Sequence, residues 1–243
     1  QGGFAGVEPA WRVSSRGAAM DRWAGVVLAA GMGIRMKSRL PKVLHRVCGK
    51  ELIRYPVELM RQLGIGRLVV VVSPSSAAAV RELLGADVEY IDQPSALGTG
   101  DALGHAAALL EGKADHLLVL GADCPLLRAD TVKALVESHT AASDDMTLLT
   151  GDTLSVGDLG RVHQDESGKV VSIVEAADDP ETSELPGVFN AGVYCFTAPW
   201  LWENLERVAP SPNGERYLTS LAGIGAAHGA RIHGVAAADS SEL

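Results

Sequence analysis

The stretch that decides the fold is LAAGMGIRMKSRLPKVLH, residues 28–45. It begins where a short apolar run, AGVVLA at residues 24–29, predicts a buried strand. In an open α/β sheet, ligands bind in the crevice at the carboxyl ends of the strands, which is where this stretch would lie. Gly31 and Gly33 permit tight turns whose backbone N–H groups can face an anion without a Cβ in the way. The stretch therefore predicts an anion-binding loop.

The glycine spacing fits neither of two familiar phosphate loops. Met36 occupies the third glycine position of the dinucleotide-binding GxGxxG fingerprint, and the GxxxxGK[ST] pattern of a Walker A loop is absent. Instead, residues 22–50 hold seven basic residues and no acidic one: Arg22, Arg35, Lys37, Arg39, Lys42, Arg46 and Lys50. Closely spaced Arg and Lys after a glycine loop suit a polyphosphate, and the alternative is a solvated basic loop.

Strand-like and helix-like segments alternate along the first half of the chain, which indicates an α/β fold with a mostly parallel sheet covered on both faces. We expect strands at residues 24–29, 68–72, 88–91 and 116–120, and helices at 52–63, 76–84, 101–110 and 129–139, the last capped by Asp130. The second half favours antiparallel strands at 146–150, 160–175 and 189–196, with a turn at Ser167-Gly168, helices at 198–207 and 215–227, and a final strand at 232–236.

Length and composition are those of a globular protein. The 243 residues suffice for one large domain or two small ones, and 47% of them are apolar. The formal net charge of −9 argues against binding to nucleic acid or to an anionic membrane surface. No apolar run reaches the roughly 18–20 residues of a membrane span. The three cysteines form no CxxC pair, so we expect a reducing cytosol rather than a disulfide framework or structural zinc site.

The first 19 residues precede Met20, which resembles a natural start just before the first strand. They contain Arg12 and Arg16 but no apolar segment like that of a secretory signal. We expect residues 1–19 to be a disordered leader or cloning remnant, and residues 20–243 to form the folded domain.

A series of motifs, in order, resembles the sugar-1-phosphate nucleotidylyltransferases. After residues 28–45 come QPSALGTG at 93–100, LGADCPL at 120–126, GRV at 160–162, IVE at 173–175, NAGVY at 190–194 and GERYLT at 214–219. The resemblance is closest to the N-terminal uridylyltransferase domain of the bacterial bifunctional N-acetylglucosamine-1-phosphate uridylyltransferase/glucosamine-1-phosphate acetyltransferases. It implies a Rossmann-like nucleotide-diphospho-sugar transferase fold, with a nucleotide-binding half at about residues 20–145 and a sugar-binding half at about 146–243.

The resemblance also implies a role for each motif. The implied nucleotide site comprises Leu28, Ala29, Ala30, Gly31, Gly33, Lys42, Gln93, Gly98 and Thr99, and the implied sugar site comprises Gly121, Ala122, Gly160, Glu175 and Asn190. Arg35, Lys42 and Asp123 would be catalytic, with Mg²⁺ bound by Asp123. Without the resemblance, other interpretations stay open. Asp123 can be a helix cap, residues 93–99 can be a polar loop, and Glu175 and Asn190 can be polar residues of edge strands.

The reaction implied by the resemblance is in-line attack of N-acetylglucosamine 1-phosphate on UTP, which gives UDP-N-acetylglucosamine and pyrophosphate without a covalent intermediate. The alternatives are another pair of nucleoside triphosphate and sugar 1-phosphate, or a nucleotide-sugar binding domain with impaired catalysis. Cys124 has no histidine linked to it by a motif, so a cysteine nucleophile is disfavoured.

Several residues depart from the pattern of that family. In this chain Ile34 stands where the family usually has Thr, Asp101 where it has His, Gly121 and Ala122 where it has Tyr-Gly, Ala177 where it has Lys, and Ala191 where it has Thr. The chain ends at Leu243, before the family's second metal ligand and its acetyltransferase domain, so we expect that domain to be absent and the protein to be a monomer or weak dimer. Residues 152–184 hold nine acidic residues against Arg161 and Lys169, which suits sugar hydroxyls better than phosphate.

Overall fold

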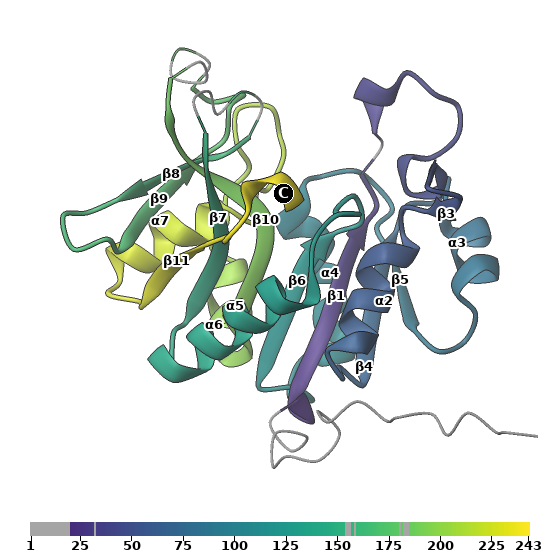
Figure 1. The fold of residues 1–243 in the computed structure, drawn as a ribbon, viewed down its shortest axis with the longest axis horizontal. Helices are drawn as coiled ribbons and strands as arrows, with labels where there is room; N and C mark the ends of the chain where they lie inside the picture. The colour runs from purple at the N-terminus through teal and green to yellow at the C-terminus, as the bar shows by residue number, and fades with distance from the viewer. Residues whose placement is uncertain (1–19, 32, 154–156, 158, 180, 182–184) are drawn as a thin grey trace, which may run out of the picture.

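β1 (Trp23–Ala29) is central to the sheet because its residues are apolar and all but Leu28 are buried. The computed structural model describes residues 20–243 except 32, 154–156, 158, 180 and 182–184. In it, β1 pairs in parallel with β4 (Arg67–Val72) on one side and with β6 (His116–Gly121) on the other. β5 (Glu89–Asp92) continues the parallel sheet beyond β4 (Figure 1). The parallel sheet predicted from the first half is confirmed.

The order of the strands creates a change of direction at β1. The chain passes from β1 to β4 and β5 on one side, and then crosses to β6 on the other. The loops that follow β1 and β6 therefore leave adjacent strand ends in opposite directions, which is the place where open α/β sheets bind ligands. Both the glycine loop and Asp123 follow these two strand ends.

The second half extends the same sheet through one reversed strand. β10 (Gly187–Thr197) runs antiparallel to both β6 and β7 (Met146–Thr153), and β11 (Ile232–Ala236) pairs in parallel with β7. β8 (Arg161–Gln164) and β9 (Val170–Val174) form the predicted hairpin, which turns at Gly168 with a φ of +83°. The hairpin joins the sheet where Phe189 of β10 pairs with Arg161. The β-rich second half is confirmed.

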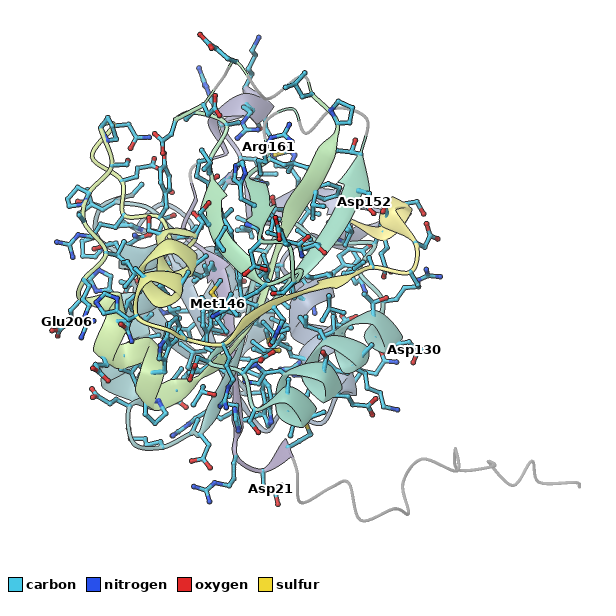
Figure 2. The ribbon with its side chains drawn as sticks, turned by 90° about the vertical axis from the view of Figure 1, so that its left-hand side faces the viewer. Asp21, Asp130, Met146, Asp152, Arg161 and Glu206 are labelled. Carbon is cyan, nitrogen blue, oxygen red and sulfur yellow. The ribbon has the colours of Figure 1, made fainter. Side chains whose placement is uncertain are left out.

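Helices cover both faces of the sheet. α2 (Arg54–Gln62), α3 (Ala77–Leu84) and α5 (Ala129–Ala142) share one hydrophobic cluster, and α4 (Thr99–Leu110), α6 (Ala198–Leu205) and α7 (Ser220–Ala227) share the other. Figure 2 shows Asp130 of α5 and Glu206, just after α6, on opposite sides of Met146 of the sheet. Among the described residues, every helix is too short or too polar to cross a membrane.

Two local predictions are wrong. The last helix begins at Ser220 rather than Glu215, because the backbone of Arg216 instead donates to Leu97 O and accepts from Gly100 N, both at 2.8 Å. Asp130 lies in the first turn of α5 but does not cap it. The N-cap is Arg128, whose backbone N–H donates at 2.9 Å to the carboxylate of Glu242 in the 3-10 helix η4 (Ser240–Glu242).

The basic stretch after β1 contains short elements that the sequence did not predict. These are the 3-10 helices η2 (Ile34–Met36) and η3 (Lys42–Leu44), and a small hairpin of β2 (Arg46–Val47) with β3 (Lys50–Glu51). The expected leader at residues 1–19 lies outside the described residues, as do the side chain of Ile34 and parts of the acidic segment at 152–184.

Candidate active site

The carboxyl ends of β1 and β6 are joined to each other. Leu28 pairs with Gly121 in the sheet, and Ala122 N donates to Leu28 O at 3.1 Å. Ala29 and Ala30 point into the two opposite hydrophobic clusters, so only their backbone groups can contact a ligand. These residues therefore form a rigid floor beneath the glycine loop.

Gly33 allows the loop to fold back against Lys42. Its φ is +61°, a left-handed conformation that favours glycine. A Cβ at Gly33 would lie 2.6 Å from Lys42 Cβ, whereas one at Gly31 would meet no heavy atom within 4 Å. Glycine at position 33 is thus required by packing within the protein, and Gly31 leaves open space at the loop surface.

Lys42 and Asp123 form an ion pair across the two strand ends. Lys42 lies on η3 and Asp123 lies just after β6, 81 residues further along the chain, and Lys42 Nζ donates to Asp123 Oδ2. The two side chains are 33% and 44% exposed, respectively. A Cβ at Gly121 would lie 2.7 Å from Asp123 Oδ1, so glycine there gives the carboxylate its room. The pair offers one cation for phosphate oxygens and one hard oxygen ligand for a metal.

The remaining basic residues of the stretch separate into two groups. Three of them form ion pairs with acidic residues outside the site: Arg22 with Asp115, Arg46 with Glu51, and Lys50 with Glu58. Arg35 lies exposed on η2, two residues after Gly33, and Lys37 and Arg39 follow it. Arg22 directly precedes β1, at the opposite end of that strand from the glycine loop, so the predicted cradle of seven charges is too large by at least this residue.

The single carboxylate of Asp123 suits a metal ion whose other ligands are substrate phosphates and water. No group of three or more His, Cys, Asp or Glu side chains able to hold a metal occurs in the part of the chain that the structure describes. Mg²⁺ commonly binds through one or two carboxylates together with substrate phosphates and water. The single, partly exposed carboxylate of Asp123 fits that mode, and does not fit a metal site built from protein ligands alone.

Gln93, Gly98 and Thr99 lie together at the start of α4. Gln93 follows β5 and is buried, and its Nε2 donates to Gly98 O at 3.2 Å and to Asp101 Oδ2 at 2.7 Å. Gly98 has a φ of +97°, and Thr99 Oγ1 accepts from Leu218 N at 3.0 Å. The structure thus joins the three residues predicted for the base, and adds Asp101, which the sequence singled out only as a departure from the family pattern.

Gly160, Glu175 and Asn190 also come together. Asn190 N donates to Gly160 O at 2.8 Å, and a Cβ at Gly160 would lie 3.5 Å from Glu175 Oε2. Thr219 Oγ1 donates to Glu175 Oε1 at 2.6 Å. Burial raises the pKa of Glu175, and this hydrogen bond partly opposes the shift. The carboxylate keeps its second oxygen, Oε2, on the side of Gly160, where a hydroxyl of a ligand can donate to it.

The side chain of Asn190 is held by its own strand. Its Nδ2 donates to Tyr194 OH at 2.6 Å, and its Oδ1 accepts from Gly192 N at 3.1 Å. The register of β10 against β7 shifts between Asn190 and Tyr194, where Gly192 has a φ of +73°. Burial raises the pKa of the Tyr194 phenol, which therefore stays protonated. Tyr194 was missed as a positioning residue, and the glycine between it and Asn190 is the signal that could have revealed the bulge.

The segment from Arg216 to Thr219 connects the two ends of the site. Its backbone contacts Leu97, Thr99 and Gly100 beside the predicted base site, and Thr219 contacts Glu175 of the predicted sugar site. Next to Asp123 in the chain, burial raises the pKa of Cys124 to about 12, so this thiol remains protonated at neutral pH. That agrees with the expectation that Cys124 is not a nucleophile.

Comparison with known proteins identifies the family. The sequence profile of the MobA-like NTP transferase domain matches residues 25–216. Curated relatives named "Bifunctional protein GlmU" are similar: that of Brevibacillus brevis is 39% identical over 224 residues, 92% of this chain and 48% of the relative. That of Pelotomaculum thermopropionicum is 41% identical over 202 residues, 83% and 44% of the two chains. The chain spans about half the length of these relatives. It belongs to the MobA-like NTP transferase family of nucleotidyltransferases.

Proposed function

We propose that this protein joins UTP to N-acetylglucosamine 1-phosphate, with release of UDP-N-acetylglucosamine and pyrophosphate. The observation that carries the proposal is the Lys42–Asp123 pair beside the glycine loop, at the point where the strand order reverses. This position offers cationic and N–H groups to a triphosphate. The similarity to relatives named GlmU, over most of this chain, supports uridylyl transfer in particular.

The proposed reaction is a direct displacement at phosphorus. An oxygen of the sugar phosphate forms a bond to the α-phosphorus of UTP while the bond from that phosphorus to the pyrophosphate oxygen breaks. Both substrates are already ionised, so the reaction needs positioning and charge neutralisation rather than a strong base. Lys42 supplies donors to the phosphate oxygens at the reacting centre, and Arg35 and the loop N–H groups hold the remaining phosphates.

The two ends of the site would hold the parts of the substrates that do not react. Gln93 faces the base, and Glu175 accepts a hydrogen bond from a sugar hydroxyl. Asn190 retains one N–H of its amide beyond the bond to Tyr194, and this can donate to the N-acetyl carbonyl. The protein contacts that already fix these side chains reduce the entropy lost on binding.

Nucleotidyltransferases generally use a divalent metal, and we propose Mg²⁺ bound by Asp123. When bound, the metal would neutralise charge on the triphosphate. Asp123 would hold it through its carboxylate. The cytosol remains the expected location of the reaction.

A pyrophosphate-release assay across four nucleoside triphosphates and several sugar 1-phosphates tests the proposal. Release with UTP and N-acetylglucosamine 1-phosphate alone supports it. Release with another pair indicates a different specificity, and thermal stabilisation by a nucleotide without release indicates a binding domain.

The Lys42→Ala variant tests the mechanism within this assay. We expect kcat to fall by about 100-fold or more with the fold intact, as when one preorganised donor to a transition-state oxyanion is removed. Lys113→Ala is the matched control, because Lys113 precedes β6 at the opposite end of the strand from Gly121. A Lys42→Ala variant with a normal kcat would contradict the role of Lys42.

A further inference from the structure

The amide of Gln93 has a single orientation. Its backbone N donates to Val72 O at 2.9 Å, which fixes the residue at the end of β5. Both hydrogens of its Nε2 are engaged, one by Gly98 O at 3.2 Å and the other by Asp101 Oδ2 at 2.7 Å. Turning the amide over would set its oxygen against a carbonyl and a carboxylate, which have no hydrogen to donate.

Asp101 dominates this choice of orientation. A charged acceptor binds an N–H more strongly than a neutral carbonyl does, and the bond to Asp101 is the shorter of the two. The carboxylate lies in the first turn of α4, where the helix dipole favours a negative charge, and His105 Nε2 lies 3.5 Å away on the next turn. Among the residues that the structure describes, no donor engages Gln93 Oε1, so the amide presents only an acceptor to a ligand.

We propose that Asp101 is a positioning residue that selects the class of nucleobase by holding Gln93 as an acceptor. This inference rests on the proposed function, in which Gln93 faces the base. Uracil carries an N–H at position 3 and can donate to Gln93 Oε1. Cytosine carries a bare nitrogen there, which would face the oxygen as a second acceptor. The site therefore favours bases with an imino N–H and rejects cytosine through repulsion between two acceptors.

The test compares the affinities of the full chain for UTP and CTP by calorimetry, so that it does not depend on turnover. We expect the wild type to bind UTP roughly tenfold or more tightly than CTP, in line with the cost of an unpaired buried acceptor. In Asp101→Leu the amide of Gln93 can turn over, and the ratio should fall about tenfold. Asp101→Asn should keep most of the selectivity, because its side-chain oxygen can still accept from Nε2.

Two further variants keep the test decisive. Asp130→Leu removes the same charge from the first turn of α5 and should leave the ratio unchanged. Asp101→Lys replaces the acceptor with a donor, so it should invert the preference and favour CTP over UTP. This variant also takes the place of Asp101→Leu in the test if Asp101→Leu fails to fold. A wild type without preference for UTP, or Leu and Lys variants with the wild-type ratio, would overturn the inference. Loss of pyrophosphate release with normal base selectivity would instead contradict the proposed function alone.

Discussion

Replacing Gly98 with alanine is expected to destabilise the fold far more than an ordinary glycine substitution. Gly98 has φ +97° and ψ 174°, a region of backbone conformation that is essentially restricted to glycine. A Cβ there would lie 2.5 Å from Arg216 O and 2.8 Å from Arg216 N. Arg216 cannot withdraw easily, because its own N and O bond to Leu97 and Gly100.

Gly85 supplies the matched control. It has φ +73° and ψ −155°, a similar conformation, but a Cβ at Gly85 would meet no heavy atom within 4 Å. Gly85→Ala should therefore cost only the backbone strain, about 1–3 kcal/mol. Gly98→Ala adds an overpacking cost of about 1–3 kcal/mol, since backbone rather than a flexible side chain blocks the methyl group. At this chain length each 1 kcal/mol lowers Tm by about 2–4 °C.

Urea unfolding followed by circular dichroism measures both variants. Gly98→Ala should also raise KM for UTP, because Gly98 O accepts from the amide of Gln93, whereas Gly85→Ala should leave KM unchanged. Equal losses of stability in the two variants would refute the reasoning, because they would mean that the Arg216 segment moves aside at no cost.

Two further predictions concern titratable groups. The raised pKa of Glu175 means that its carboxylate is protonated at a higher pH than an ordinary Glu, so KM for the sugar phosphate should rise on acidification. In Glu175→Gln this KM should be about tenfold higher, and its acid rise should be smaller than that of the wild type, since only the titration of the sugar phosphate at about pH 6 remains; an equal acid rise in both proteins would contradict the role. His139 is fully buried, and burial, followed by the facing His116, lowers its pKa from 6.5 to about 4. The unfolded chain therefore binds the proton first, and the native state should lose about 3 kcal/mol of stability between pH 6.5 and 4; urea unfolding of His139→Gln should show a flatter profile.

The elements that could be predicted from the sequence are those with local causes. The strands β1, β4 and β6 are continuous apolar runs, which predict a sheet buried on both faces without knowledge of the fold. The start of the last helix could not be predicted, because Arg216 bonds to Leu97, more than 100 residues earlier, and this distant contact draws the segment out of helical conformation.

The same division holds in the site. The glycine loop and its basic residues are contiguous, so the pattern alone predicts an anion site after the first strand. The pairing of Lys42 with Asp123, and of Glu175 with Thr219, depends on how the strands are ordered, which no local pattern reveals. The charge count also overstated the phosphate cradle, since Arg22 lies before β1, at the opposite end of that strand from the glycine loop.

The Lys42–Asp123 ion pair can be replaced by contacts with a ligand at little cost in free energy. Both side chains are partly exposed, and an ion pair of that kind contributes only about 0–1 kcal/mol to stability. Separating the pair is therefore cheap, while η3 and the end of β6 keep the backbones of the two residues in place. In the proposed reaction, Lys42 would exchange a carboxylate oxygen for a phosphate oxygen, and the carboxylate of Asp123 would become available to a cation. The pair compensates the two charges, and it would hold both groups in orientation for the proposed substrates.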